Sequence, residues 1–327
     1  MDIKEKNIVT IGGGSGQFIL LSGLRDLENI RATAIVSMVD SGGSTGRLRD
    51  ELGILPPGDI IKCLLALSPY QAADRCIMLK RFKGDPRLAG HSAGNMLLTM
   101  LSRYTGDFPA SVAALAEILE VDGTILPVTI DRATLVAELS DGKRIFGEQA
   151  IDLPRGKSRE QIKDIFLVPH HHGTISVHPP VLDAIEKADY IFIGPGDLYT
   201  SIIPNLIVPG VRQALQNTSA KIYFTINIMT KFGETHNFSG KDFAIKIEDC
   251  LELKIDGFIG NITKPTKKIL DSYAKQNSDF VSIDMSDPFW NHRNLHLADM
   301  LDTTAKTAHH DPKKLAQCIV KIMFEYR

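Results

Sequence analysis

The stretch "IVTIGGGSGQFILLSGL", residues 8–24, decides the fold class. A run of β-branched residues leads into four glycines and a serine, after which apolar residues recur at helical spacing. This order predicts a buried strand, a glycine turn and a helix. Glycines let backbone N–H groups approach an anion closely, and a helix N-terminus attracts negative charge. The stretch therefore indicates a phosphate-binding turn, with a plain strand-to-helix connection as the alternative.

The glycine spacing does not fit the dinucleotide fingerprint G-x-G-x-x-G. Counting from Gly12, the third glycine would fall at Gln17, and counting from Gly14 it would fall at Ile19. NAD is therefore not an expected cofactor.

Composition narrows the class of protein further. The chain has 327 residues, 43% of them hydrophobic, which is enough for a large core. Its 37 basic and 39 acidic residues are mixed, so we expect neither nucleic acid nor a membrane surface as a partner. No apolar run approaches the roughly 20 residues of a membrane span. Cys63, Cys76, Cys250 and Cys318 lie far apart, which favours reduced thiols and a cytoplasmic location.

Strand and helix patterns alternate along the rest of the chain. This rhythm predicts an α/β, Rossmann-like, doubly wound and mostly parallel sheet within a single domain over residues 1–327. Residues 59–121 have helical periodicity and predict a helical insertion, whereas alternation around Asp141-Gly142 predicts a β-hairpin over about 132–152. The other buried strands are expected at residues 32–40, 165–168, 190–194, 222–227, 257–261 and 280–284.

Loops of small polar residues follow four of the expected strands. In an open α/β sheet, ligands bind beyond the carboxyl ends of the strands. Such loops bury little surface and are costly to order, so their convergence indicates a large polar ligand, with local capping by Asp40 or Ser44 as the alternative. The expected contacts to a nucleotide diphosphate are Gly12, Gly13, Gly14, Ser15 and Gly16; Asp40, Ser41, Gly42, Gly43, Ser44, Thr45, Gly46 and Arg47; Gly194, Gly196, Asp197, Leu198 and Thr200; and Asn227, Met229 and Thr230.

Three more residues are candidates for the same crevice. His91 and Asn95 lie in "GHSAGN", which opens a predicted helix, so they either contact the ligand or merely cap that helix. Tyr273 would stack on a base or sugar, or else lie on a helix surface.

We predict no catalytic nucleophile and no metal site from motifs. The sequence contains no G-x-S-x-G, H-E-x-x-H or P-loop motif. Histidines are concentrated in "VPHHHGTISVHPP", residues 168–180, but without a carboxylate or cysteine at metal-binding spacing. We expect that segment to be an exposed loop.

Seven motifs occur in the order found in one known family: "GGGSG", "VDSGGSTGRLRDELGILPPGD", "HSAGN", "VDGTILPVT", "GPGDLYTSIIPNL", "MTKFGET" and "HHDPKKLA". From about Asn7 to Phe324, the chain resembles the gluconeogenesis factor family, the YvcK-type branch of the CofD-like superfamily. The resemblance implies a cytoplasmic protein that binds a nucleotide-diphosphate ligand, and a UDP-sugar is the ligand it favours. It also implies roles in carbon metabolism, cell-wall synthesis and cell shape, with regulatory protein partners, and it is compatible with a homo-oligomer.

The same superfamily offers an enzymatic alternative. Its transferase branch moves a phospholactyl-type group from a guanosine diphosphate donor with Mg²⁺, which would make Asp40 a metal-holding residue here. That branch has paired aspartates where this chain has Asp40-Ser41-Gly42-Gly43, which places the chain on the regulatory side. The chain also departs from its own branch at three places. His309 stands where the family often has an arginine, Lys231 stands where it has a glutamine, and Ile61-Lys62 stand where it has an arginine-asparagine pair. Ligand choice is therefore expected to differ within the family.

Overall fold

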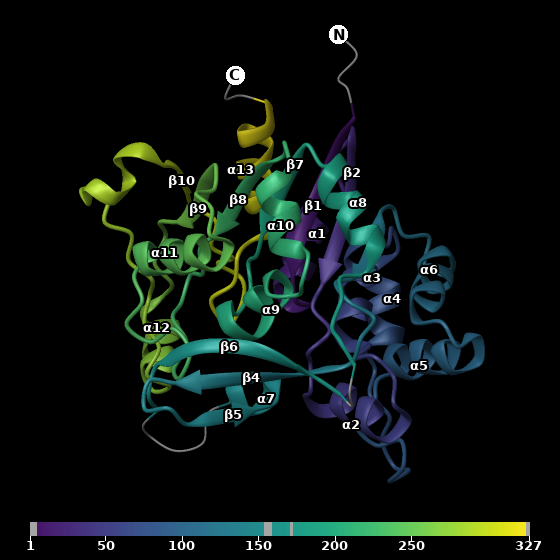
Figure 1. The fold of residues 1–327 in the computed structure, drawn as a ribbon. Helices are drawn as coiled ribbons and strands as arrows, with labels where there is room; N and C mark the ends of the chain where they lie inside the picture. The colour runs from purple at the N-terminus through teal and green to yellow at the C-terminus, as the bar shows by residue number, and fades with distance from the viewer. Residues whose placement is uncertain (1–4, 154–158, 171–172, 325–327) are drawn as a thin grey trace.

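A parallel β-sheet forms the centre of the molecule (Figure 1). The computed structural model describes residues 5–153, 159–170 and 173–324. Within this part of the chain, every strand pair of the main sheet is parallel. The seven strands are β1 (Lys6–Gly12), β2 (Ile30–Val36), β3 (Thr124–Pro127), β7 (Tyr190–Ile193), β8 (Lys221–Thr225), β9 (Gly257–Asn261) and β10 (Asn294–Ala298).

The order of these strands defines where a ligand can bind. They lie side by side as β10-β9-β8-β7-β1-β2-β3. The chain therefore proceeds outward from β1 to β3 in one direction, and from β7 to β10 in the other. Loops that leave β1 and β7 turn toward opposite faces at such a switch point, which leaves a crevice at the carboxyl ends of the strands.

Helices cover both faces of the sheet, as the alternating side chains of β1 require. Val9 and Ile11 belong to a cluster with residues of α8, α10 and α11, whereas Ile8 packs with α1 and α13. The predicted doubly wound sheet is thus confirmed. These helices and their neighbours are α1 (Ser15–Leu24), α2 (Gly43–Leu52), α8 (Pro179–Lys187), the π-helix η1 (Leu198–Ile202), α9 (Ile203–Leu206), α10 (Val211–Asn217), α11 (Gly240–Leu251), α12 (Lys267–Ala274), the 3-10 helix η2 (Pro288–His292) and α13 (Pro312–Phe324).

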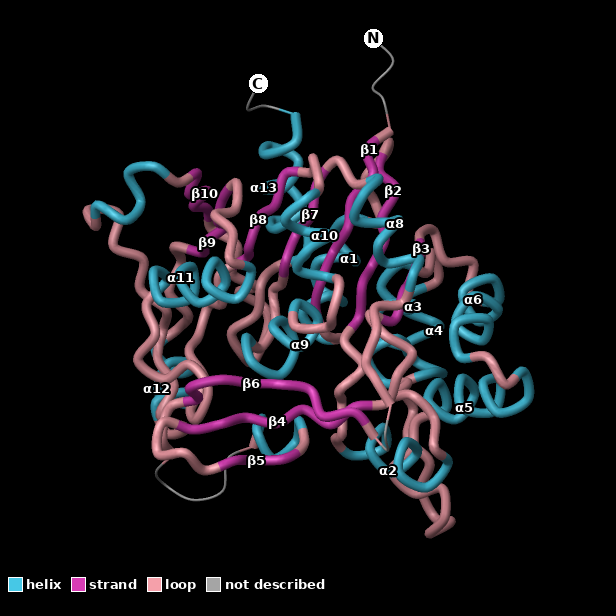
Figure 2. Tube along the Cα trace, in the orientation of Figure 1, coloured by secondary structure: helices cyan, strands magenta, loops and turns pink. Residues whose placement is uncertain are grey.

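The predicted helical insertion is also confirmed. It consists of α3 (Gly58–Leu67), α4 (Gln71–Met78), α5 (Ala93–Thr105) and α6 (Phe108–Ile118). Figure 2 shows α5 and α6 at the side of the molecule next to β3, whereas α3 packs beside α1 and against β2 and β3. Leu64, Leu98 and Leu115 join them in one core with residues of β2. None of the helices in the described part of the chain combines the length and apolar character that a bilayer span needs.

A second, three-stranded antiparallel sheet lies across the carboxyl ends of the main strands (Figure 1). It has the order β5-β4-β6, with β4 (Ala133–Leu139), β5 (Arg144–Phe146) and β6 (Ile162–Pro169), and the short helix α7 (Glu148–Asp152) follows β5. The predicted hairpin is confirmed, because β4 and β5 are joined by a tight turn at Asp141-Gly142. Its predicted end near residue 152 was wrong, because the hairpin ends at Phe146 and α7 follows it. The start of β1 and the end of α13 lie at the opposite end of the molecule.

Three details of the strand prediction were wrong. Residues 165–168 belong to β6, which pairs antiparallel with β4 rather than entering the main sheet. Residues 280–284 form no strand apart from an isolated bridge between Phe280 and Met229, and the edge strand is instead β10. The strand expected to reach Asp40 ends at Val36, where the chain turns into the second glycine loop.

Candidate functional site

The first and third predicted loops touch each other through glycine. A β-carbon on Gly16 would overlap the carbonyl oxygen of Pro195 and lie 3.2 Å from the Cα of Gly196. On the same turn, a β-carbon on Gly13 would lie 2.8 Å from Ser201 Oγ, a residue of η1. Residues at these positions must be glycine for the loops after β1 and β7 to come this close.

The second loop, after β2, packs against the start of the helical insertion. A β-carbon on Gly58, the first residue of α3, would overlap Thr45 Oγ1. Asn95 Nδ2 donates a hydrogen bond to Ser44 Oγ (3.1 Å), and Ser44 Oγ lies 2.9 Å from His91 Nδ1. These three residues are buried, and they connect the first turns of α2 and α5. The structure therefore brings His91 and Asn95 to the second loop, and the residue between them that caps α5 is Ser92.

Three helices begin at this crevice without a side-chain cap. The N-cap residues of α1, α2 and α3 are Gly14, Gly42 and Pro57. None of these three residues has a side chain that accepts a hydrogen bond from the first turn of its helix. The N-terminus of a helix leaves up to four backbone N–H groups unpaired and carries a partial positive charge. Three such ends in one place form a surface suited to an anion.

One lysine and two aspartates lie between the starts of α1 and α3. Lys62 Nζ donates to Ser15 Oγ (3.2 Å) and to Asp59 Oδ1 (3.0 Å). Although burial opposes its charge, the Asp59 carboxylate raises the pKa of Lys62 above the ordinary value. Burial, and then the neighbouring Asp59, raise the pKa of Asp40. The crevice thus combines backbone donors and an ammonium group with carboxylates that repel one another.

Helix α7 reaches into the crevice from the small sheet. The backbone N–H of Ser41 donates to Glu148 Oε2 (3.2 Å), and the N–H of Gln149 donates to Ser41 Oγ (2.9 Å). Burial, followed by the charge of Asp40, raises the pKa of Glu148 to about 7. Sequence patterns did not indicate Glu148, because its place depends on how the small sheet packs.

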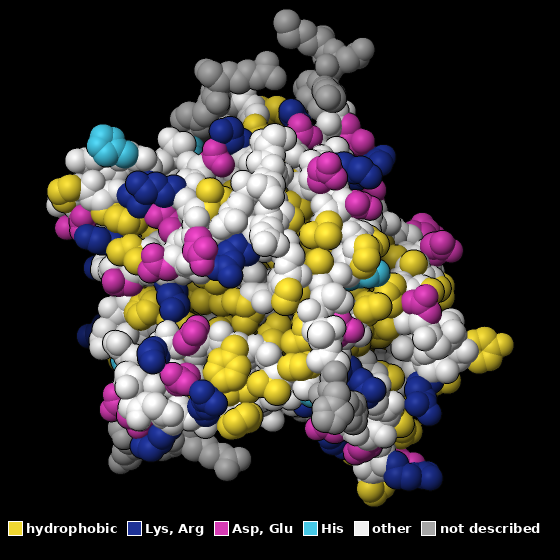
Figure 3. Space-filling model, viewed as in Figure 1, with side chains coloured by type: hydrophobic (Ala, Val, Ile, Leu, Met, Phe, Trp, Pro, Cys, Tyr) yellow, Lys and Arg dark blue, Asp and Glu magenta, His cyan; other side chains and the backbone are white. Residues whose placement is uncertain are grey.

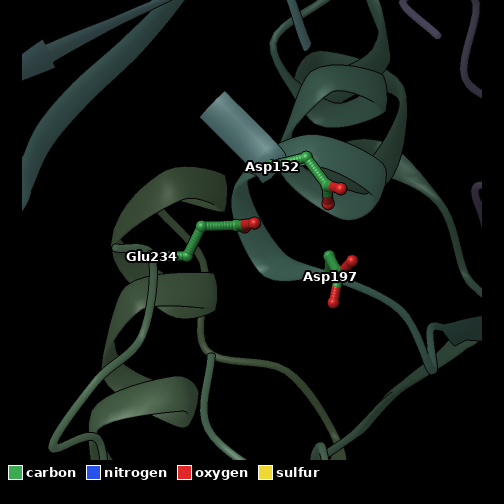
Figure 4. Close-up of side chains that lie close together, drawn as sticks. All are labelled: Asp152, Asp197 and Glu234. Carbon is green, nitrogen blue, oxygen red and sulfur yellow. The ribbon is translucent and has the colours of Figure 1, made fainter. Parts of the chain in front are cut away.

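At the far end of the crevice, three carboxylates surround Lys231. Figure 4 shows Asp152 of α7, Asp197 and Glu234 pointing toward one another. Lys231 Nζ pairs with all three: with Asp152, with Asp197 at 2.7 Å and with Glu234 at 3.2 Å. Three carboxylates this close would suit a metal ion, but the ammonium group of Lys231 already provides the cation. Burial raises the pKa of Glu234 to about 8.

Several polar atoms in the same region have no hydrogen-bond partner among the described residues. They are buried atoms of residues that end or follow β2, β7 and β8 in the sequence, namely Ser37 Oγ, Thr200 Oγ1, Thr225 Oγ1, Asn227 Oδ1 and Glu234 Oε2, and the Nε and Nη2 atoms of Arg159 lack a partner as well. A buried polar group left unpaired costs about 1–3 kcal/mol. Their concentration here indicates that water or a ligand completes their hydrogen bonds.

Other residues predicted for the site have different surroundings. The side chains of Leu198 and Met229 lie in hydrophobic clusters, and Tyr273 packs partly buried against the second of these. Thr230 Oγ1 accepts from the backbone N–H of Asp279 (2.8 Å), so its hydroxyl holds a neighbouring loop. Arg47 is exposed and donates to the backbone of residue 89 (2.6 Å). The side chains of Leu198, Met229, Thr230 and Tyr273 are therefore engaged in packing or in holding neighbouring backbone.

The structure describes two of the histidines in residues 168–180, His170 and His178. His170 Nε2 lies 2.9 Å from Thr134 Oγ1 in the small sheet. His171 and His172 lie outside the described residues. His309, which stands where the family often has an arginine, is exposed. Its Nε2 atom lies 2.7 Å from Thr307 Oγ1.

A separate groove of about 620 Å³ lies between β6, η1 with α9, α10 and α11. Its lining includes Ile165, Tyr199, Ile203, Arg212 and Lys246. Figure 3 shows apolar side chains exposed across this part of the surface, with charged ones around them. Tyr199 and Ser201 are both residues of η1, so this π-helix lies between the groove and the crevice.

Comparison with known proteins fits this architecture. The model of the family described as 2-phospho-L-lactate transferase CofD matches residues 8–301. The chain belongs to the CofD family. Within that family it is similar to the putative gluconeogenesis factor of Thermotoga maritima, at 37% identity over 96% of this chain and 98% of the relative. It is likewise 37% identical to the gluconeogenesis factor of Bacillus subtilis, over 84% of this chain and 83% of that protein.

The fold of this CofD family member also matches a solved structure. A crystal structure of a UPF0052 family protein from Bacillus halodurans aligns with a TM-score of 0.90 and 34% identity. The match covers 97% of this chain and 100% of the other. The resemblance to gluconeogenesis factors that the sequence motifs indicated is therefore confirmed.

Proposed function

We propose that this CofD family protein binds a nucleoside diphosphate linked to a sugar, and that its preferred ligand is a UDP-sugar. We propose further that it acts as a cytoplasmic regulator in carbon metabolism and cell-wall synthesis. The observation that carries the proposal is the meeting of the uncapped starts of α1, α2 and α3 at one crevice. Their unpaired N–H groups and Lys62 provide the donors and positive charge that a diphosphate requires. The similarity to gluconeogenesis factors supports the regulatory part.

Magnesium is the cation we propose for this ligand. Asp40, Asp59 and Glu148 bring three carboxylates to the place where the diphosphate would lie, against one ammonium group from Lys62. A divalent cation would offset this repulsion, and carboxylate oxygens are suitable ligands for Mg²⁺. Asp40 and Asp59 would hold the cation, which would neutralise charge on the phosphate oxygens.

The same carboxylates favour a second candidate function. A Mg²⁺-dependent transferase acting on a nucleotide-diphosphate donor would need a similar set of groups around the diphosphate. The two functions differ in whether the bound ligand is consumed.

Occupancy of the crevice would be communicated through α7. This helix contacts the second loop through Glu148 and reaches Lys231 through Asp152. A diphosphate at the start of α2 would compete with the Glu148 carboxylate for the N–H of Ser41. We propose that the resulting change in α7 and the small sheet alters contacts with protein partners.

Calorimetry tests the proposal directly. UDP-glucose, a GDP-linked donor and NAD are titrated into the protein, each with and without Mg²⁺. We expect UDP-glucose to bind in a Mg²⁺-dependent manner and to be recovered intact after long incubation. Release of a nucleotide product would favour the transferase instead, and binding of NAD alone would contradict both functions.

A further inference from the structure

We propose that two copies of this chain associate through helix α4 of the helical insertion, and that the two α4 helices lie antiparallel across a two-fold axis. The surface concerned takes no part in the proposed nucleotide site, so the two proposals stand or fall separately.

Helix α4 differs from the other helices of the insertion in its burial. Each of α3, α5 and α6 contains buried residues, whereas α4 contains none. Its half-buried residues are Gln71, Asp74 and Met78, which mark the side that rests on α3 and α5. At 3.6 residues per turn, Cys76 lies at the centre of the opposite side. That outward side has no partner among the described residues.

The outward side of α4 and its two ends are apolar. Ile77 is 61% exposed and Tyr70, just before the helix, is 58% exposed. Leu79 and Phe82, which follow the helix, are exposed as well. Single exposed apolar residues are normal on a protein surface, but several on one short segment mark an interaction site. The exposed face of α4 is therefore suited to contact with another protein surface.

The shape of this face fits a second copy of itself. Ala72, Ala73 and Cys76 are small and exposed, and Ile77 projects beside them. In an antiparallel pair centred near residue 75, Ile77 of each copy packs over Ala73 of the other. Both Cys76 side chains then lie close to the axis. A two-fold axis makes each of these contacts twice, as in most homodimers.

Charge favours the same antiparallel arrangement. Lys80 and Lys83 follow the C-terminal end of α4, whereas Asp122 lies close to its N-terminal end, where the Asp122 N–H donates to the backbone oxygen of Leu67 (3.2 Å). These three charged side chains are exposed and have no ion pair among the described residues. An antiparallel pair brings Lys80 of each copy toward Asp122 of the other, whereas a parallel pair would bring the lysines together.

The size of the face predicts how stable the dimer is. A standard interface buries roughly 800 Å² on each partner, and one helix of eight residues with its flanks supplies less than that. We therefore expect a reversible equilibrium between monomer and dimer that shifts with protein concentration.

Sedimentation equilibrium of the full chain tests the proposal. We expect a monomer–dimer equilibrium, and Ile77→Asp should raise its dissociation constant at least tenfold, because the pair would bury two unpaired carboxylates. Ile118→Asp is the matched control, since Ile118 of α6 is 63% exposed and lies outside this face. A chain that stays monomeric at every concentration, or equal weakening by both variants, would overturn the proposal.

A thiol cross-linker locates the axis. Cys63 and Cys318 are buried and Cys250 is half-buried, whereas Cys76 is exposed. A short bis-maleimide should therefore join two wild-type chains covalently through Cys76. The covalent dimer should be absent in Cys76→Ser and strongly reduced in Ile77→Asp. Equal cross-linking of wild type and Cys76→Ser would place the contact at another surface and overturn the proposal.

A charge exchange tests the antiparallel arrangement. Lys80→Glu places like charges opposite each other and should weaken the dimer at least threefold. Adding Asp122→Lys to this variant reverses both charges and should restore dimerisation. A double variant that associates no better than Lys80→Glu would overturn the antiparallel arrangement.

Discussion

Gly16 at the start of α1 packs against Pro195 so closely that a β-carbon on Gly16 would overlap the Pro195 carbonyl oxygen. This contact joins the loop after β1 to the loop after β7 across the switch point of the sheet. Gly16 is therefore required by packing. The N-cap of the same helix, Gly14, has no side chain that could cap the first turn.

Two glycine substitutions separate packing from binding. Gly16→Ala should destabilise the protein by about 3 kcal/mol, because the methyl group meets backbone that has no room to move. Gly43→Ala should cost only about 1 kcal/mol for its left-handed backbone, since nothing lies within 4 Å of the added carbon. Urea denaturation measures both. Similar losses in the two variants would contradict this account of the Gly16 contact.

Lys62 should contribute to binding more than to folding. Lys62→Met removes the ammonium group that lies beside Ser15 and Asp59, so affinity for UDP should fall at least tenfold, which corresponds to about 1.4 kcal/mol. Lys254→Met, at an exposed lysine of the loop before β9, is the control and should bind normally. Equal affinity of the two variants in calorimetry would remove Lys62 from the site.

Nucleotide binding in the presence of Mg²⁺ should strengthen as the pH rises from 6 to 8. Deprotonation of Glu148, whose pKa is about 7, adds a negative charge beside Asp40, whose own pKa is raised. We expect the attraction of this charge for the cation held by Asp40 and Asp59 to exceed its competition with the diphosphate for the N–H of Ser41. Glu148→Gln should flatten the dependence above pH 6. A wild-type affinity that declines over this range would show that deprotonation of these groups does not assist binding.

The stability of the unliganded protein should change with pH in the opposite direction. Glu148 and Glu234 have pKa values in the folded state of about 7 and about 8, above their ordinary value of 4.5. At pH values between the ordinary pKa of 4.5 and these raised pKa values, the folded state binds more protons than the unfolded state. The free energy of unfolding therefore falls as the pH rises from about 5 to 8.5. Glu234→Gln should reduce that fall. Urea denaturation across this range provides the measurement.

Removal of Lys231 should create a requirement for a cation. Lys231→Met leaves Asp152, Asp197 and Glu234 without their shared counter-ion and should cost about 3 kcal/mol. Added Ca²⁺ or Mg²⁺ should restore part of the lost melting temperature in this variant and have little effect on Lys231→Arg. If cations stabilise neither variant, the three carboxylates are not held together by charge.

The sequence predicted those parts of the site that depend on local signals. Glycine turns after β1 and β2 were visible because they interrupt apolar runs, and the reversal of strand order brought them to one edge. Glu148 and Asp152 could not be found this way, because only the packing of the small sheet brings α7 to the crevice. Residues 165–168 were assigned to the wrong sheet for a similar reason: a short apolar run does not show which strand it pairs with.

The central position of β1 affects when the binding site can form during synthesis. Its two neighbours are β2, which follows soon after it, and β7, which begins only at Tyr190. A nascent chain that has emerged only as far as the helical insertion therefore has one wall of the crevice and lacks the other. The nucleotide that we propose as the ligand would therefore have no complete site to occupy until β7 and β8 have joined β1.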